Sequence, residues 1–437
     1  MSILFFIYFK FLFYRFFFPF LSLHAILYIF EGAASGAMPF YLETEVSMKN
    51  FEFYAPTHIY FGKGYADQIG TLIVKYGYRK PLLVYGGGSI KQSGLYGRVI
   101  ASLESAGLSH AEIGGVQPNP KLALAKEGIQ ICRAENCDIV LAVGGGSAID
   151  TAKVIALGVP YSGDVWDFWS GKNTPVAALR TVCILTIAAA GSEMSQSAVI
   201  TNEEGSIKRG INSEFNRPLF SIMDPELTYT LPKYQIACGI VDIMMHTIER
   251  YMTRKSEVEL TDRIGEALLK TMVHYGPIAY HDPDNYEARA EIMWASSLSH
   301  NDLTGCGKDY FTINHKLGHE LSAVYGTAHG ASLSIILPAW MKYVYSYNIP
   351  RFAQFAVRVM GCEYDYANPE NTALAGIRAV EAFFHSLDMP IRLSEIDVPE
   401  ADIPMLAARV TANGANIFET YIQLSTKQIE DIFHLAY

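Results

Sequence analysis

Residues 239–249 read GIVDIMMHTIE and place Asp242 and His246 four positions apart in an apolar run. The recurrence of apolar residues from Ile236 to Ile248 predicts a helix over residues 233–252. On a helix, side chains four positions apart leave the same face, with their Cβ atoms roughly 5–6 Å apart. An acid and an imidazole in that arrangement suit two ligands of one metal ion.

A second pair of side chains with the same spacing follows further along the chain. His315 and His319 lie four positions apart in NHKLGHEL at residues 314–321, and His329 follows in TAHG at residues 327–330. The five positions supply one carboxylate and up to four imidazoles. That mixture suits zinc or iron better than calcium or magnesium, which prefer oxygen ligands.

Each of these positions also has a purely structural interpretation. An isolated Asp-x-x-x-His on a helix is more often a surface pair or a hydrogen-bonded core histidine than a metal site. Here the helix is strongly apolar, so we expect the face that carries Asp242 and His246 to be buried. A buried carboxylate is costly without a compensating charge, and a cation supplies one. Taken together, the positions favour a metal.

Beyond Leu231 the pattern becomes helical. Pro225 and Pro232 interrupt the preceding periodicity, so we place a domain boundary at residue 232 and predict an all-helical domain over residues 233–437. Gly276-Pro277 has the usual order of residues at a helix end. Besides the first helix, we predict helices over residues 257–275, 286–298, 335–345, 373–387 and 404–411.

Upstream of residue 232 the pattern is that of an α/β domain over residues 48–232. A strand is predicted within residues 51–61, before Gly62-Lys63-Gly64. Two apolar runs, PLLVY at 81–85 and DIVLAV at 138–143, lead into GGGSIK at 86–91 and GGGSAIDTAK at 144–153. A strand, a glycine turn and a helix, found twice, predict a parallel sheet with flanking helices.

The two glycine turns favour phosphate binding. Without side chains the backbone can approach an anion closely, and the N–H groups at the start of the following helix point toward it. Two such turns suit a dinucleotide. Neither matches the G-x-G-x-x-G fingerprint, and the alternative is an ordinary turn, with Ser147 and Asp150 forming a capping box.

Two further segments have open interpretations. The aromatic cluster at residues 166–169 (WDFW) could wall a pocket for an apolar substrate or a nicotinamide ring, or it could pack within its own loop. Gly191-Ser192-Glu193 could begin a close backbone approach to the cofactor, or it could be an ordinary turn.

Residues 1–47 differ from the rest of the chain. Residues 3–30 are long and apolar enough to span a bilayer, although Lys10, Arg15 and Pro19 interrupt them. The segment is also rich in the amino acids that AT-rich non-coding DNA encodes, and Met48 begins an ordinary globular composition. We therefore favour an overextended start over a genuine signal-anchor, and we exclude the segment from fold reasoning.

Charge and cysteine content narrow the class of protein. The 44 acids exceed the 34 bases, which argues against nucleic acid as a partner. The six cysteines lack a C-x-x-C pair or a disulfide-framework spacing, as in reduced, cytosolic proteins. We expect a cytoplasmic protein, or a membrane-anchored one if residues 1–47 are genuine.

From Met48 onward these motifs resemble the iron-containing (group III) alcohol dehydrogenase family, and most of all its NADPH-dependent butanol dehydrogenase branch. The resemblance rests on FGKG at 61–64, the two glycine turns, Gly191-Ser192-Glu193, Asp224-Pro225 and the acid with its histidines. It implies a dehydroquinate synthase-like architecture, in which an α/β dinucleotide-binding domain precedes an all-α metal-binding domain. It also implies short primary alcohols or aldehydes as substrates, and a homodimer.

The resemblance implies roles for individual residues as well. One Fe²⁺ or Zn²⁺ would be held by Asp242, His246, His315 and His329, with His319 as a catalytic non-ligand in proton relay. The implied cofactor-binding positions are Gly86, Gly87, Gly88, Ser89, Lys91, Gly144, Gly145, Gly146, Ser147, Asp150, Lys153, Thr186, Ser195, Lys208, Thr230 and Leu231.

The first turn bears on which nicotinamide cofactor is used. NAD sites usually place an acid near the adenine ribose, whereas a 2′-phosphate needs that acid absent and a base nearby. Residues 85–89 have no acid, Gly87 resembles a position where NAD-preferring relatives carry Asp, and Lys91 supplies charge. We predict that NADP(H) is preferred over NAD(H). Ala188, Ala190 and Ser195 depart from the family pattern, and the two polar losses, at Ala190 and Ser195, could weaken cofactor binding.

Two alternatives remain open. The same architecture serves NAD-linked polyol dehydrogenases of the glycerol type. The chain could also be a membrane-anchored nucleotide-binding protein in which the altered loop at residues 188–195 has silenced catalysis.

Overall fold

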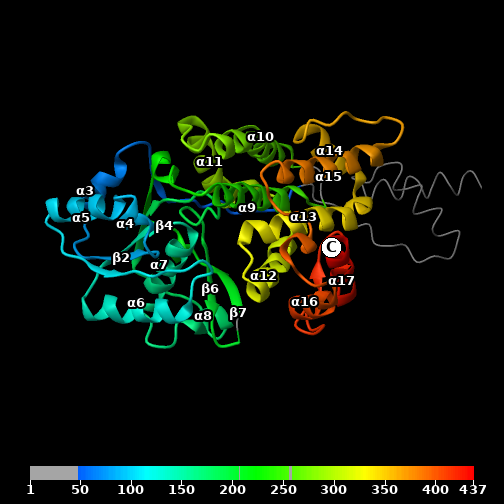
Figure 1. Cartoon of the computed structure of the whole chain (residues 1–437). Helices are drawn as coiled ribbons and strands as arrows, with labels where there is room; N and C mark the ends of the chain where they lie inside the picture. Colours follow the sequence, from blue (N-terminus) through cyan, green and yellow to red (C-terminus); the bar gives the residue numbers. More distant parts are fainter. Residues whose placement is uncertain (1–47, 206, 255–257) are drawn as a thin grey trace, which may run out of the picture. The chain divides into compact units, whose positions relative to one another are not determined.

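The computed structural model describes residues 48–205, 207–254 and 258–437 (Figure 1). Both interpretations of the hydrophobic N-terminal segment fall on residues outside these ranges. Residues 48–437 form one compact unit. Within the described ranges, no helix is long and apolar enough to cross a membrane.

A six-stranded sheet organises the first half of the described chain, in the order β1-β8-β5-β4-β2-β3. All its neighbouring strands are parallel, which confirms the predicted sheet. Every residue of β2 and of β4 is buried, as expected where helices cover both faces of a sheet. The strands are β1 (His58–Phe61), β2 (Pro81–Tyr85), β3 (Ala111–Ile113), β4 (Ile139–Gly144), β5 (Arg180–Leu185) and β8 (Phe220–Met223).

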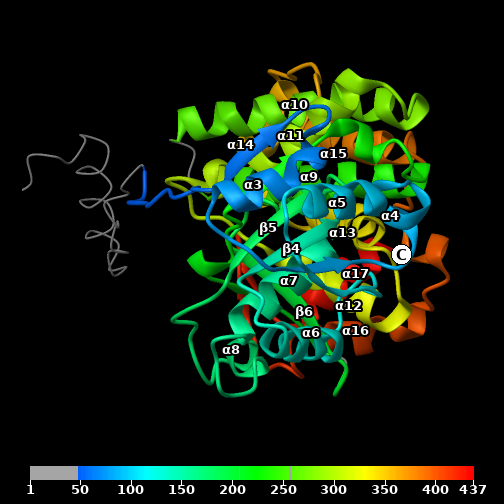
Figure 2. The same cartoon turned by 90° about the vertical axis from the view of Figure 1, so that its left-hand side faces the viewer.

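Helices cover both faces of the sheet (Figures 1 and 2). The two faces belong to two apolar cores. Leu83 and Leu141 pack in the core that includes helices α3 (Ile69–Lys75) and α5 (Leu95–Ser105). Leu82 and Val140 point the other way, into the core with α6 (Leu122–Ala134) and α7 (Gly146–Gly158). This second core continues into the helical half, so it joins the two halves.

Smaller elements complete this half. Strands β6 (Ser197–Asn202) and β7 (Ile207–Asn212) form an antiparallel hairpin, which the sequence pattern does not predict. The strand expected within residues 51–61 is confined to its last four positions as β1. The short helices are α4 (Ser89–Gln92) and α8 (Trp166–Ser170), with 3-10 turns η1 (Tyr65–Gln68), η2 (Glu214–Asn216) and η3 (Pro225–Thr228).

Helix α9 (Lys233–Tyr251) lies at the centre of the second half. Every residue from Ile236 to Tyr251 is buried, because α9 packs against α10, α11, α12 and α13. The other elements are α10 (Glu259–His281), α11 (Tyr286–Ser299), η4 (Leu303–Gly305), α12 (Ile313–Tyr325), α13 (His329–Val344), η5 (Tyr345–Tyr347), α14 (Ile349–Arg358), α15 (Pro369–His385), η6 (Leu393–Ile396), η7 (Glu400–Asp402), α16 (Ile403–Val410), a hairpin of β9 (Phe418–Glu419) and β10 (Gln423–Leu424), and α17 (Thr426–Leu435).

The helix expected to stop at Gly276-Pro277 was predicted wrongly, since α10 continues through both residues to His281. A Cβ atom at Gly276 would lie 3.3 Å from Ile240 and 3.4 Å from Phe383. The glycine therefore allows close packing of α10 against α9. Burial of this helix face outweighs the hydrogen bond that Pro277 cannot donate.

The change from mixed α/β structure to helices falls at Pro232, where the sequence predicts the boundary. The second half is helical apart from the β9–β10 hairpin. Whether residues 48–232 and 233–437 fold as separate domains stays a prediction, because the whole of 48–437 packs as one unit.

Candidate metal centre and dinucleotide cleft

The carboxyl ends of β2, β4 and β5 lie side by side at one edge of the sheet. The glycine turns follow β2 and β4, and Thr186 follows β5, where its N–H donates to the carbonyl of Gly144 at 3.0 Å. The chain runs outward from β2 to β3 and returns to β4 before continuing to β5. The order of strands therefore reverses between β2 and β4, the usual position of a dinucleotide crevice in such sheets.

Helix α7 begins directly at the second glycine turn. Gly145 is its N-cap, and no side chain caps the helix, so the alternative of a Ser147–Asp150 capping box is wrong. A Cβ atom at Gly145 would lie 3.0 Å from Ile187, and one at Gly144 would lie 2.7 Å from Ala148. The turn therefore needs glycine, and it leaves the positive end of the α7 dipole open to an anion.

Asp150 and Lys153 lie deeper, in a buried polar network. The ammonium group of Lys153, which is fully buried, donates to Ser192 Oγ at 2.9 Å and to the carbonyls of Ser195 at 3.1 Å and Ser197 at 2.7 Å. Asp150 accepts from Ser192 Oγ at 2.5 Å. Burial lowers the pKa of Lys153 to about 8 and raises that of Asp150. The network fixes the loop that follows Gly191, so these residues have a structural role besides any cofactor contact.

The first glycine turn is open. A Cβ atom at Gly87 would meet nothing within 4 Å. The Lys91 ammonium lies 4.7 Å from the centre of the Tyr96 ring and 5.1 Å from that of Tyr85. The Tyr96 hydroxyl donates to Glu112 at 2.8 Å, so one base and one acid flank this turn.

The remaining cofactor candidates lie on other segments. Lys208, on β7, donates to Asn119 Oδ1 at 2.9 Å. Burial lowers the pKa of Lys208 to about 8, and the negative charges of Asp242 and Asp150 oppose that shift. Thr230 and Leu231 connect η3 to α9, and the Leu231 N–H donates to the carbonyl of Thr228 at 3.1 Å.

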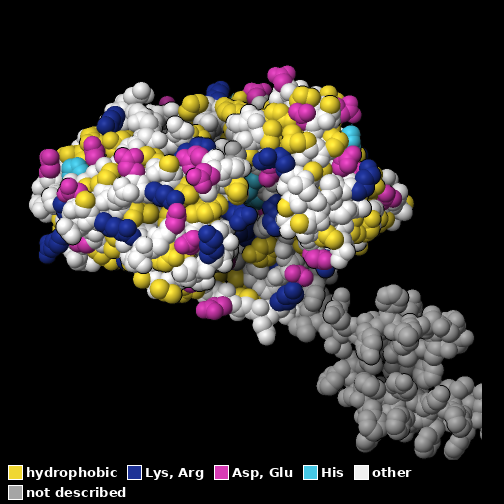
Figure 3. Space-filling model, turned by 90° about the horizontal axis from the view of Figure 1, so that it is seen from below, with side chains coloured by type: hydrophobic (Ala, Val, Ile, Leu, Met, Phe, Trp, Pro, Cys, Tyr) yellow, Lys and Arg dark blue, Asp and Glu magenta, His cyan; other side chains and the backbone are white. Residues whose placement is uncertain are grey.

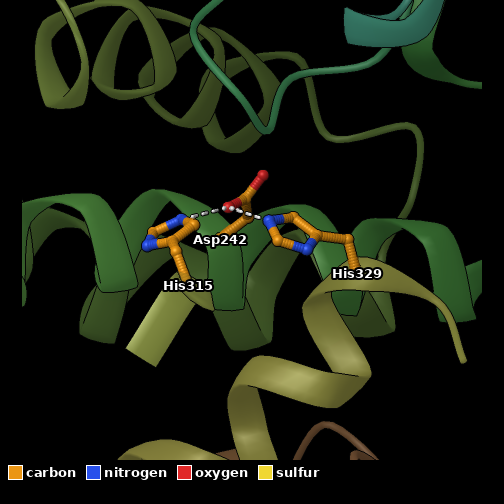
Figure 4. Close-up of side chains that lie close together, drawn as sticks. All are labelled: Asp242, His315 and His329. Atoms are coloured by element: carbon orange, nitrogen blue, oxygen red, sulfur yellow. Dashed lines mark ion pairs between the residues drawn. The ribbon is translucent and has the colours of Figure 1, made fainter. Parts of the chain in front are cut away.

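Asp242 and two histidines converge from three helices (Figure 4). Asp242 Oδ1 lies 3.6 Å from His315 Nε2 and 3.6 Å from His329 Nε2. A tetrahedral site with bonds of about 2.0–2.2 Å has donor atoms about 3.3–3.6 Å apart. One donor atom from each residue lies within 4.8 Å of the other two, which is compact enough for one ion.

His246 lies next to these three residues but is not part of the compact donor set. Its Nδ1 is 3.7 Å from Asp242 Oδ1, and its ring is stacked on that of His315 with centroids 4.6 Å apart. Asp242 Oδ1 and the two ring nitrogens His246 Nδ1 and His315 Nε2, which face it, are buried and have no hydrogen-bond partner in the described part of the chain. Such orphaned groups are costly, and a cation would satisfy an acid and imidazoles together. The residues present fit a divalent zinc or iron ion.

Glu249, for which the sequence pattern predicts no role, orients His315. Its Oε2 lies 2.7 Å from His315 Nδ1, and its Oε1 accepts from the backbone N–H of Asn314 at 2.8 Å. This contact leaves Nε2 of His315 to face Asp242. Burial opposes protonation, but Glu249 and Asp242 together raise the pKa of His315 to about 9. Glu249 is seven residues after Asp242, on the same helix face, and that spacing was the available signal.

Two more histidines, His319 and His300, lie beside these residues. The His319 ring lies 5.4 Å from that of His329 and 6.4 Å from that of His315. Burial lowers the pKa of His319 well below its ordinary value. His300, at the end of α11, has its ring 4.1 Å from that of His246 and was missed, since no spacing pattern links it to the other histidines.

The structure also shows how the aromatic segment at residues 166–169 and the turn at Gly191 pack. Phe168 and Trp169 are buried in the core, and the Trp169 indole donates to the carbonyl of Ala198 on β6 at 3.1 Å, so these rings pack beyond their own loop. Gly191 has φ of 63°, and a Cβ atom there would lie 2.7 Å from the carbonyl oxygen of Ser296. Gly191 therefore makes a tight turn where the loop meets α11.

The histidine cluster opens on one side. The His329 side chain is 28% exposed, whereas those of Asp242 and His246 are 5% and 6% exposed. Figure 3 shows a hollow in the middle of one face, with histidine side chains in it and Lys and Arg side chains around it. A small substrate can therefore reach the cluster from solvent.

Comparisons with known proteins give the class of protein. The chain is 41% identical over 391 residues to NADH-dependent butanol dehydrogenase A of Clostridium acetobutylicum, which covers 89% of this chain and 100% of the relative. It is 34% identical over 371 residues to NADPH-dependent aldehyde reductase YqhD of Escherichia coli, which covers 84% and 94%. The crystal structure of NADH-dependent butanol dehydrogenase A from Thermotoga maritima superposes with a TM-score of 0.86 at 37% identity, covering 90% and 100%. The chain is thus an NAD(P)-dependent oxidoreductase.

The family follows from sequence profiles of the two halves. The profile "Iron-containing alcohol dehydrogenase" matches residues 56–225, and "Fe-containing alcohol dehydrogenase family, C-terminal" matches residues 236–437. The chain belongs to the iron-containing alcohol dehydrogenase family, as the sequence motifs indicate.

Proposed function

We propose that this alcohol dehydrogenase interconverts short-chain primary alcohols and aldehydes, with butyraldehyde as a representative substrate. The observation that carries the proposal is the position of Asp242 Oδ1, 3.6 Å from one nitrogen of each of His315 and His329. That cluster is open to solvent through the side of His329. Similarity to proteins named butanol dehydrogenase supports the choice of substrate.

The metal site that we propose consists of Asp242, His246, His315 and His329, holding one Fe²⁺ or Zn²⁺. Two donors are already oriented, since Glu249 fixes the His315 ring and Asp242 faces three imidazoles at 3.6–3.7 Å. When bound, a divalent cation polarises a carbonyl oxygen as a Lewis acid, and a nicotinamide carries the hydride. The side chains contribute by binding the ion and excluding bulk water from its buried side.

For the cofactor we propose NADP(H) in preference to NAD(H). The support is the open Gly87, the lack of an acid in residues 85–91 and the Lys91 ammonium beside the turn. Two observations favour NAD(H) instead: Glu112 is an acid near the first glycine turn, and some relatives are named as NADH-dependent. The pyrophosphate would lie at the uncapped start of α7, between the two glycine turns. We keep the other implied contacts, among them Thr186, Lys208 and Leu231, as part of this proposal.

The test is a steady-state assay of the full chain, purified without oxygen, together with metal analysis. We expect close to one divalent ion per chain and reduction of butyraldehyde with kcat/KM at least about tenfold higher than oxidation of glycerol. NADPH should give a higher kcat/KM than NADH. Faster turnover of glycerol with NAD would instead favour the polyol alternative, and a metal-free, inactive protein would sink the proposal.

His319 is proposed to move the proton that completes aldehyde reduction. Its ring is 5.4 Å from that of His329 and outside the compact donor set. We expect His319→Ala to lower kcat about 10²-fold, as for loss of a general acid–base group, and to leave metal content unchanged. Measuring kcat and metal content on one preparation separates a proton relay from a metal ligand. If His319→Ala lost its metal, His319 would be a ligand and not a relay.

The sequence-based expectations on assembly and location complete the proposal. We propose a cytoplasmic homodimer that acts on small molecules, with residues 48–232 for the cofactor and 233–437 for the metal. The support is the family to which the chain belongs and the acidic net charge of −10.

A further inference from the structure

His300 lies beside the cluster of Asp242, His246, His315 and His329. It follows a different helix from those that carry the cluster residues. It follows α11 directly, and its ring centroid is 4.1 Å from that of His246 with the planes at 53°. That contact is closer than the 4.6 Å between His246 and His315. His300 Nδ1 is buried and has no hydrogen-bond partner in the described ranges.

His246 lacks the support that its neighbour has. Glu249 holds the far nitrogen of His315 at 2.7 Å, which fixes the ring that faces Asp242. His246 presents Nδ1 toward Asp242, so its Nε2 is the nitrogen that would carry a proton once Nδ1 binds an ion. Metal-binding histidines almost always donate this second N–H to an acceptor.

The neighbouring ring offers such an acceptor. A neutral imidazole has one donor and one acceptor nitrogen, and the orphaned Nδ1 of His300 is buried beside His246. We propose that His300 positions His246 for metal binding, by accepting a hydrogen bond from the ring N–H that His246 keeps when its other nitrogen binds the ion. This inference rests on the proposed metal site.

The surroundings hold His300 in place. A Cβ atom at Gly191 would lie 2.8 Å from His300 Cβ, so the loop after β5 packs directly on this residue. The same loop carries Ser192, which the buried Lys153 fixes at 2.9 Å. His300 thus connects the loop near the second glycine turn to the helix that carries Asp242 and His246. Its position is fixed from both sides, as a positioning residue requires.

The test compares variants of the full chain that keep or lose an acceptor at this position. His300→Leu and His300→Phe keep apolar bulk without an acceptor, whereas His300→Gln keeps a carbonyl oxygen. Zn²⁺ affinity is measured by competition with a chelator, and the visible spectrum of the Co²⁺-loaded protein reports the ligand geometry. His274→Leu, at an exposed position of α10, is the matched control.

We expect His300→Leu and His300→Phe to bind Zn²⁺ about 10–100-fold more weakly and to alter the Co²⁺ spectrum. His300→Gln should recover most of the affinity, and His274→Leu should match the parent protein. Parent-like affinity in both apolar variants would overturn the inference. So would equal weakness of all three His300 variants, because that would require the imidazole itself as a ligand.

The failure of this inference is distinguishable from failure of the proposed function. If the parent protein binds no Zn²⁺ or Fe²⁺, the metal site itself is wrong. If the parent binds tightly and the apolar His300 variants bind equally well, only the role of His300 is wrong. Thermal unfolding of the metal-free proteins shows that each variant is folded before its affinity is compared.

Discussion

Asp242→Asn is expected to abolish metal binding and to lower kcat/KM for aldehyde reduction by about 10³-fold or more. Asp242 is the one acid of the cluster, and its Oδ1 faces nitrogens of three histidines at 3.6–3.7 Å. The amide keeps the size of the side chain but removes the negative charge that attracts a divalent cation. Metal analysis after dialysis and a steady-state assay on the same sample measure both effects.

The control for this substitution must separate metal loss from unfolding. Because Asp242 is buried, its replacement by a larger residue would disturb packing, whereas asparagine fits the same space. We expect the metal-free Asp242→Asn protein to unfold at a temperature within a few degrees of the metal-free parent. A variant that keeps its metal and its activity would contradict the assignment of Asp242 as a ligand.

The sequence predicted those parts of the fold that local patterns determine. The strands β2 and β4 coincide with the two short apolar runs of the sequence. A glycine turn follows each strand, as predicted. Helix α9 is strongly apolar, and its predicted and observed C-terminal ends differ by one residue. The burial of Asp242 and His246 followed from the same pattern, because apolar residues lie on both sides of them in the helix.

The misses have a common physical cause, since each depends on contacts between segments far apart in the chain. His300 meets His246 only because α11 ends beside α9. The helix end at Pro277 was predicted from local preference, which packing of Gly276 against Ile240 overrides. Strand β7 lacks a buried apolar face, because every one of its residues is partly or fully exposed. Capping at Ser147 failed because Asp150 bonds to Ser192 instead.

Lys153→Met is expected to lower the free energy of unfolding by about 3–5 kcal/mol, the usual cost of breaking a buried charged network. The Lys153 ammonium, fully buried, donates to Ser192 and to the carbonyls of Ser195 and Ser197. Methionine matches its length but leaves those carbonyls without this donor and removes the Lys153 charge that favours the Asp150 carboxylate. Denaturant unfolding of the metal-free proteins measures the difference.

The pH dependence of that difference identifies the lysine as its source. Burial lowers the pKa of Lys153 from 10.5 to about 8, so between these values the unfolded chain binds more protons than the native one. The stability contributed by this group therefore rises with pH across that window, and the gap between parent and Lys153→Met should widen from pH 8 to pH 10. Lys172→Met, at a side chain that is 74% exposed, should change stability by less than about 0.5 kcal/mol at any of these pH values. A gap that is constant with pH would mean that Lys153 has the same pKa in the native and the unfolded protein, as an exposed lysine does, and the buried network would then not be what holds the loop after Gly191.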